Sequence, residues 1–231
     1  MALMDEFKEE RESIKNKSFK EKVGYYWYYY KWRLIVPIII FIIGFNFIST
    51  IVNRPKIILD GMFINITDFN NLEKLDLFTA SFVESQELDS SKYHIAYNPN
   101  HTYISEEKKA TMPEEAIDPS ANKYAIQNVV AGLGSKSLNF VIGPADSLLE
   151  IDSNQLFADL SEILTEEQQK AYESYYIYLE GEETIPILLD IQHCEELMDL
   201  YGDPDIPLAI GIVADLEEMD MMLKFIDYMM N

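Results

Sequence analysis

The chain has 231 residues, of which 18 are Lys or Arg and 40 are Asp or Glu, so its formal net charge is −22. This acidic balance argues against binding of DNA, RNA or anionic lipid by the folded part of the chain, and we expect no nucleic-acid partner. A single cysteine, Cys194, excludes an intrachain disulfide and a metal cluster of cysteines.

Residues 34–52 form a run without a single charge, LIVPIIIFIIGFNFISTIV. At about 1.5 Å rise per residue, a helix of this length spans about 28 Å, close to the ~30 Å hydrocarbon core of a bilayer. The run predicts a transmembrane helix with the lipid bilayer as its partner. A buried core helix is the alternative, but the run is longer than a typical buried segment. Asn46 within the run can join helices through its amide, although one amide is a weak signal for a dimer.

The flanks of the apolar run predict its orientation. Residues 1–33 carry eight Lys or Arg and six Asp or Glu, whereas residues 54–231 carry ten and 34, respectively. Because short positive segments stay in the cytoplasm, we expect residues 1–33 inside and an extracytoplasmic domain at 57–231. The aromatic run at 25–32 fits an inner headgroup belt, with a carbohydrate- or partner-binding surface as the alternative. The long charged segment before the run favours an uncleaved signal anchor in the cell membrane.

The outer part of the chain is long enough for one domain with a hydrophobic core. Residues 57–66 are rich in β-branched and apolar types and predict a strand, bulged at Gly61. Thr67 or Asp68 should cap a helix that runs to about Gln86. The core-facing side chains of this helix should be Leu72, Leu75, Phe78 and Phe82.

A second strand is predicted at 93–97. Residues 98–120 contain three prolines and many charges, which predicts a long loop or a poorly ordered insertion. A helix over 121–133 and a short buried strand over 138–142, ended by Gly143, should follow. The inward side chains of the helix should be Ile126, Val129, Val130 and Leu133.

Two further helices are expected after the third strand. Asp152 or Ser153 should begin one helix, and Thr165 followed by Gln168 has the spacing of a capping box at the start of the next. The aligned apolar positions of the first of these helices are Leu156, Phe157, Leu160 and Ile163.

The C-terminal part predicts strands at 175–179, 184–191 and 206–214, with a short helix holding Cys194 between the last two. Asp215 should cap the final helix. Because helices and strands alternate and the strands are apolar on both faces, we expect an α/β sandwich with a mostly parallel or mixed sheet. The inward stripe of the final helix should be Leu216, Met219, Leu223, Ile226 and Met230.

The sequence contains no common catalytic or nucleotide-binding motif such as G-x-S-x-G, H-E-x-x-H or the P-loop. His193 and Cys194 are adjacent, and adjacent helix residues point about 100° apart, so a buried structural thiol is expected instead of a catalytic pair. Acidic residues between 203 and 220 lack the EF-hand spacing; a solvated edge is expected, with a calcium site as the alternative. We expect no enzyme activity, no metal and no cofactor.

Several segments carry a resemblance to a known family. Residues 206–214 (IPLAIGIVA) and 215–230 (DLEEMDMMLKFIDYMM) resemble the end of bacterial extracellular solute-binding proteins of the type-2 periplasmic fold. Residues 140–143 (FVIG) and 157–164 (FADLSEIL) are similar to a strand and a following stretch of that family. The whole chain also resembles single-pass, membrane-anchored proteins of Gram-positive gut bacteria, with YYWYYYKW at 25–32 before the span.

The resemblance implies one lobe of a type-2 periplasmic binding protein, tethered by a transmembrane helix. Family members have two lobes with the ligand between them and a lipoprotein anchor, and this chain is too short for two full lobes. The implied function is non-catalytic presentation or sensing of a small solute or peptide at the cell surface. The alternative is a degenerate binding fold that serves as a scaffold or accessory subunit beside a membrane protein partner. Ligands in such folds lie at the carboxyl ends of the strands, which nominates Thr67, Asp68, Gly143, Asp146, Gln192 and Asp215.

Overall fold

The computed structural model describes residues 18–67, 72–114, 118, 120–179, 185–202, 204–213 and 218–231. The chain divides into two compact units, Met1–Arg54 and Pro55–Asn231, and each is described by itself.

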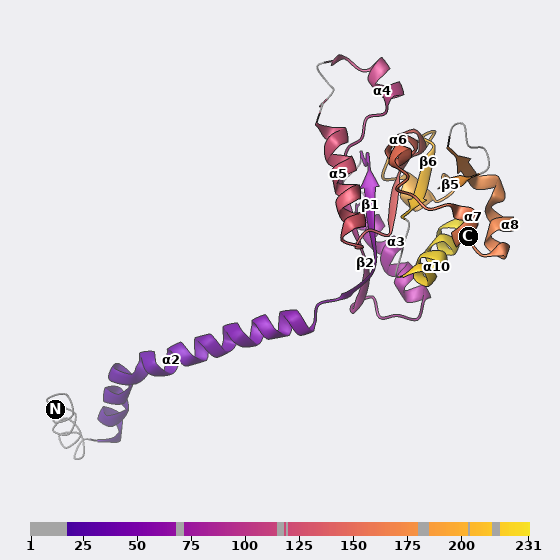
Figure 1. Ribbon diagram of the computed structural model, residues 1–231. Helices are drawn as coiled ribbons and strands as arrows, with labels where there is room; N and C mark the ends of the chain where they lie inside the picture. The colour runs from indigo at the N-terminus through magenta and orange to yellow at the C-terminus, as the bar shows by residue number, and fades with distance from the viewer. Residues whose placement is uncertain are drawn as a thin grey trace. The chain divides into compact units, whose positions relative to one another are not determined.

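The described part of the first unit is one long helix, α2 (Phe19–Val52), which bends in its N-terminal part (Figure 1). The helix begins with a capping box, in which the backbone N–H of Ser18 donates to the carboxylate of Glu21 over 3.0 Å. Within α2, the stretch Lys31–Ile51 is long and apolar enough to cross a membrane, and no part of it is buried by the protein. Helix formation through the apolar run is thus confirmed.

The second unit is built on a six-stranded mixed sheet with the order β2-β1-β3-β6-β5-β4. The neighbours β2, β1 and β3 are parallel, β6 is antiparallel to both β3 and β5, and β4 is antiparallel to β5. The prediction of a mixed α/β architecture is confirmed. The strands are β1 (Lys56–Ile64), β2 (Tyr93–His101), β3 (Phe140–Pro144), β4 (Tyr176–Tyr178), β5 (Pro186–Asp190) and β6 (Leu208–Ile212).

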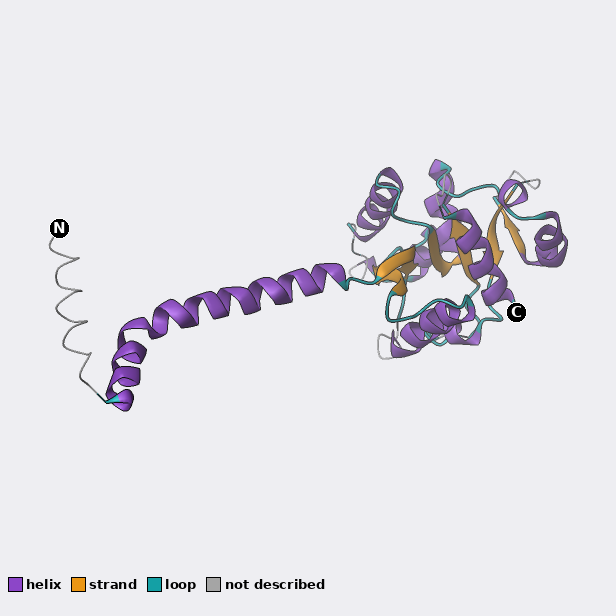
Figure 2. Ribbon diagram, turned by 90° about the horizontal axis from the view of Figure 1, so that it is seen from below, coloured by secondary structure: helices purple, strands orange, loops and turns teal. Residues whose placement is uncertain are grey.

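Helices cover both faces of this sheet (Figures 1 and 2). Buried side chains form two clusters, one containing Phe82 of α3 and Phe225 of α10, the other containing Val129 of α5 and Leu148 of α6. The central strands β3 and β6 are buried along their whole length, as expected for strands with helices on both sides. The helices are α3 (Leu72–Ser85), α4 (Glu106–Thr111), α5 (Ala121–Gly134), α6 (Ala145–Ile151), α7 (Leu160–Ile163), α8 (Glu166–Tyr172), α9 (Glu195–Met198) and α10 (Met219–Met230), with 3-10 turns at Asp152–Asn154 and Glu173–Tyr175.

Aromatic rings fill the first cluster. The ring centroid of Phe225 lies 5.0 Å from that of Phe82 and 5.2 Å from that of Phe140. The Phe140 ring lies over Gly61 of β1, where a Cβ atom would come within 2.2 Å of it. Gly61 is therefore a site of close strand packing, and the bulge predicted there is wrong: the irregularities of β1 lie at Ile57/Leu59 and Met62/Ile64.

The structure corrects two segment predictions. Residues 98–120 are not one long loop, because β2 extends to His101 and α4 follows at Glu106–Thr111. No continuous helix begins at Asp152. Instead α6 occupies Ala145–Ile151, Phe157 pairs with Val213 as an isolated β-bridge, and α7 is a single turn. Gly143 does not end the third strand, because β3 continues to Pro144, which directly precedes α6.

Two inward faces also differ from the predicted ones. In α10 the fully buried residues are Met222, Phe225, Ile226 and Met229. Of the predicted stripe, Ile226 is fully buried, while Leu223 and Met230 are partly buried and pack against the core. In α5, Val130 is 48% exposed and the buried positions are Ala125 and Val129. The predicted capping box of Thr165 and Gln168 is confirmed at the start of α8. Asp68, Asp215 and Leu216 lie outside the described residues.

Candidate functional site at the carboxyl edge of the sheet

The carboxyl ends of β1, β3 and β5 lie at one edge of the sheet, because these strands run in the same direction. From β1 the chain crosses to β2 on one side, and from β2 it returns to β3 on the other side, so this edge contains a topological switch point. Thr67, Asp146 and Gln192 follow these strands, and Gly143 lies within β3 near its carboxyl end. The other two predicted site residues, Asp68 and Asp215, lie outside the described part of the chain.

The switch point is covered by residues 103–106, which we call the crossing segment. Asn65, directly after β1, has the left-handed backbone conformation (φ 64°). Its Oδ1 accepts from the backbone N–H of Tyr103 over 2.8 Å, and its Nδ2 donates to the carbonyl of Tyr103 over 2.6 Å. The Asn65 side chain thus hydrogen-bonds both backbone groups of Tyr103, as a neighbouring strand would.

A second asparagine holds the next residue in the same way. Asn122 of α5 accepts from the backbone N–H of Ile104 and donates to its carbonyl, each over 2.8 Å. Since Tyr103 and Ile104 are both buried, these four hydrogen bonds satisfy backbone groups that have little access to water. Two amide side chains, one directly after β1 and one in the first turn of α5, therefore fix the crossing segment.

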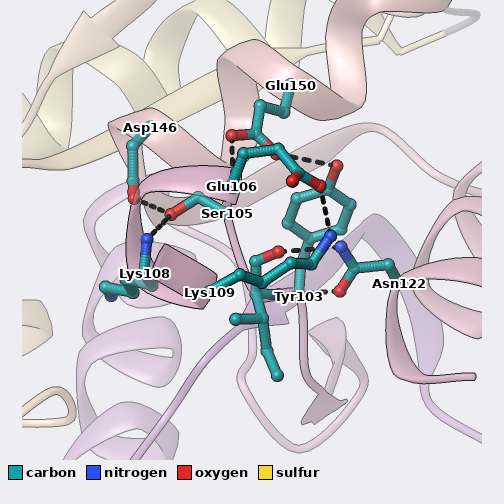
Figure 3. A network of polar contacts seen from close by, with 9 residues as sticks. Tyr103, Ser105, Glu106, Lys108, Lys109, Asn122, Asp146 and Glu150 are labelled. Atoms are coloured by element: carbon teal, nitrogen blue, oxygen red, sulfur yellow. Dashed lines mark hydrogen bonds and ion pairs between the residues drawn. The ribbon is translucent and has the colours of Figure 1, made fainter. Parts of the chain in front are cut away.

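Two carboxylates of α6 complete the network (Figure 3). The hydroxyl of Ser105, which is fully buried, donates to Asp146 over 2.5 Å and caps α4 by accepting from the N–H of Lys108. Glu150 accepts from the backbone N–H of Glu106 over 2.8 Å and from the Tyr103 hydroxyl over 3.1 Å. Burial, with the charge of Glu150 as a smaller cause, raises the pKa of Tyr103 to about 12.

The remaining predicted residues also serve internal contacts. The hydroxyl of Thr67 donates to the carbonyl of Tyr201 over 2.6 Å, and the Gln192 side chain donates to the carbonyl of Ile206 over 2.8 Å. Gly143 packs against β1, where an added Cβ atom would lie 3.0 Å from that of Ile64. Each of these residues thus makes an internal contact with another part of the domain.

Two surface clefts have linings drawn from other parts of the domain. One of about 460 Å³ lies between α3 and β2 and includes Asp76 and Tyr97 in its lining. Another of about 470 Å³ lies between α8 and α10 and includes Tyr172 and Asp227. None of the four predicted site residues that the structure describes lines either cleft.

Nucleophilic chemistry has little support among the described residues. Cys194 is buried, as the sequence predicts, and burial is the main cause that raises the pKa of its thiol to about 11. The neighbouring His193 is exposed and packs its ring against Tyr175. The described residues hold no group of three or more His, Cys, Asp or Glu side chains suited to a metal ion.

Neither a family model nor a curated protein matches this chain. Among solved structures, it is similar to the cyclic alpha-maltosyl-1,6-maltose binding protein from Arthrobacter globiformis. The match has 16% identity and a TM-score of 0.33, and it covers 60% of this chain and 29% of that protein. The chain thus spans less than a third of the length of the sugar-binding protein, and the likeness is distant.

Sequence reasoning missed the residues that fill this edge, namely Asn65, Tyr103, Ser105, Asn122 and Glu150. One signal was available: Asn65 stands directly after a predicted strand, and asparagine is among the few residues that readily adopt the left-handed conformation. The partners of Asn65 lie 38 residues further along the chain, and no local pattern marks them.

Proposed function

We propose that this chain is a single-pass membrane protein whose non-catalytic α/β domain is held in the extracytoplasmic space, where it serves as an accessory or scaffold subunit of a membrane complex. The observation that carries the proposal is the closed carboxyl edge. A binding crevice at this position requires free polar groups, whereas the side chains of Asn65 and Asp146 are hydrogen-bonded to the crossing segment.

The apolar stretch of α2 supports the membrane part of the proposal. A core helix of a soluble protein would be mostly buried, whereas this stretch has no protein cover. The exposed rings of Trp27, Tyr28 and Trp32 stand at its N-terminal end, where an interfacial aromatic belt is expected. The excess of Lys and Arg over acidic residues at 1–33 favours a cytoplasmic N-terminus.

We expect the full chain to resist extraction from membranes by alkaline carbonate and to dissolve in detergent. Protease added to intact, wall-stripped cells should remove the α/β domain, while inverted vesicles should protect it. As a control, the same chain in detergent should be cleaved from either preparation. Protection in intact cells, or release of the full chain without detergent, would overturn the proposed topology.

Capture of a small solute or peptide is a second candidate, favoured by one observation: Thr67 and Asp146 follow β1 and β3, the two strands that flank the switch point. Such a ligand would have to displace the crossing segment. In a thermal-shift screen of the full chain in detergent micelles, a sugar, amino acid, peptide or divalent cation at 100 times its Kd would stabilise the domain by about 2.7 kcal/mol. We expect no shift, together with co-purification of a membrane protein; a saturable shift would instead support ligand capture.

A further inference from the structure

The apolar stretch of α2 carries its polar side chains on one face. Between residues 35 and 52 the polar side chains are Asn46, Ser49 and Thr50, and Asn53 follows at the end of the helix. These four positions recur at i, i+3, i+4 and i+7, which places them on one side of a helix. Asn46, Ser49 and Thr50 lie in the C-terminal half of the apolar stretch, and Asn53 lies just beyond its end.

This polar face continues towards the N-terminus as a row of isoleucines. The row Ile35, Ile39, Ile42, Asn46, Ser49 and Asn53 has alternating spacings of four and three residues, and we call it the α2 seam. This alternation is the heptad pattern by which two helices pack side by side, and a polar residue within such a seam can fix the register of the pair. Pro37, Gly44 and Ile48 project from the other side of the helix.

The hydrogen bonds within α2 leave the amide of Asn46 only partly used. Its Nδ2 donates to the carbonyl of Ile42 over 2.8 Å, and Thr50 donates to the backbone carbonyl of Asn46 over 2.9 Å. Among the described residues, no group donates to Oδ1 of Asn46, and its second amide hydrogen has no acceptor. In hydrocarbon there is no water to replace these partners, so an isolated helix leaves a carboxamide unsatisfied at a real cost.

We propose that the α2 seam pairs two copies of this chain as parallel transmembrane helices, with the two Asn46 amides hydrogen-bonded to each other; this rests on the proposed membrane span. A carboxamide both donates and accepts, so it is complementary to a second copy of itself. Copies inserted in the same orientation place Asn46 at the same depth, and a two-fold axis joins identical residues. The α2 seam carries no charge, so this packing brings no like charges together within the bilayer.

The test uses the full chain in its native membrane with single added cysteines. Ser49→Cys lies on the α2 seam, and Ile48→Cys is its matched neighbour on the other side of the helix. Under mild oxidation by copper phenanthroline we expect a disulfide-linked dimer from Ser49→Cys and little from Ile48→Cys. The unmodified chain gives the background, because its only cysteine, Cys194, is buried.

Adding Asn46→Leu to the Ser49→Cys chain should weaken the dimer about threefold to tenfold, as loss of one interhelical hydrogen bond does in membranes. Phe47→Leu is the control, since Phe47 lies off the α2 seam, and it should leave the dimer fraction unchanged. Equal linking at positions 48 and 49, a product with a different protein, or no effect of Asn46→Leu would each overturn the pairing. Release of the chain by alkaline carbonate would instead reject the membrane span itself.

Discussion

Replacing Asn65 with alanine should lower the free energy of unfolding of the α/β domain by about 3 kcal/mol. The substitution removes both hydrogen bonds to the backbone of Tyr103 and leaves that buried N–H and C=O unpaired. It also forces alanine into a left-handed conformation, which adds about 1 kcal/mol. For a domain of this size we expect the Tm of the full chain in micelles to fall by about 6–12 °C.

Two controls separate the causes of this effect. Asn65→Gly adopts the left-handed backbone without strain. It should lower the free energy of unfolding by about 2 kcal/mol, the part that comes from the lost hydrogen bonds. Asn122→Ala removes the matching pair of bonds to Ile104 from an ordinary helical position and should cost a similar amount. Hydrogen exchange should accelerate at the amides of Tyr103 and Ile104; unchanged exchange in Asn65→Ala would contradict this account of the crossing segment.

Phe225→Ala should lower the free energy of unfolding by about 3–5 kcal/mol, because the cavity it leaves lies among large buried rings that cannot collapse fully. Phe225 packs against Phe78 and Phe82 of α3 and against Phe140 of β3, so it joins two helices to the sheet. Near-ultraviolet circular dichroism of the tyrosines, followed on heating, measures the loss.

The matched control for this prediction is Tyr124→Ala, which also removes an aromatic ring from a helix. Tyr124 is 60% exposed on α5, so its loss should change the free energy of unfolding by less than about 1 kcal/mol. If the two variants were equally stable, the aromatic cluster would not be the centre of the core.

Local sequence patterns predicted most elements of the fold, because apolar runs and capping residues act over a few positions. The strands at β3 and β6 and the capping box of Thr165 depend on such short-range chemistry. The failures have tertiary causes. The buried face of α10 centres on Phe225 because the rings of Phe82 and Phe140 meet it there, and nothing within the helix records their position.

The sequence could predict which described residues lie at the carboxyl edge of the sheet, but not whether that edge is open. Strand direction brings Thr67, Gly143 and Asp146 to one edge, as the resemblance to binding proteins implies. Whether that edge is open depends on Tyr103 and Ser105, which come from a segment rich in charges and prolines that reads as a loop. Pairing across such sequence distances has no signature in a single chain.

The outer strand β2 has a consequence for the solubility of the domain. In the described sheet it pairs with β1 alone, and its sequence YHIAYNPNH contains no Lys, Asp or Glu. Proteins commonly place charged residues in such edge strands, which prevents them from pairing with strands of other molecules. In β2, Pro99 removes one backbone N–H donor. Beyond that, we expect the net negative charge of the domain to oppose pairing with other chains. We therefore expect the solubility of this domain to depend on ionised carboxylates and to fall in acid, where they are protonated.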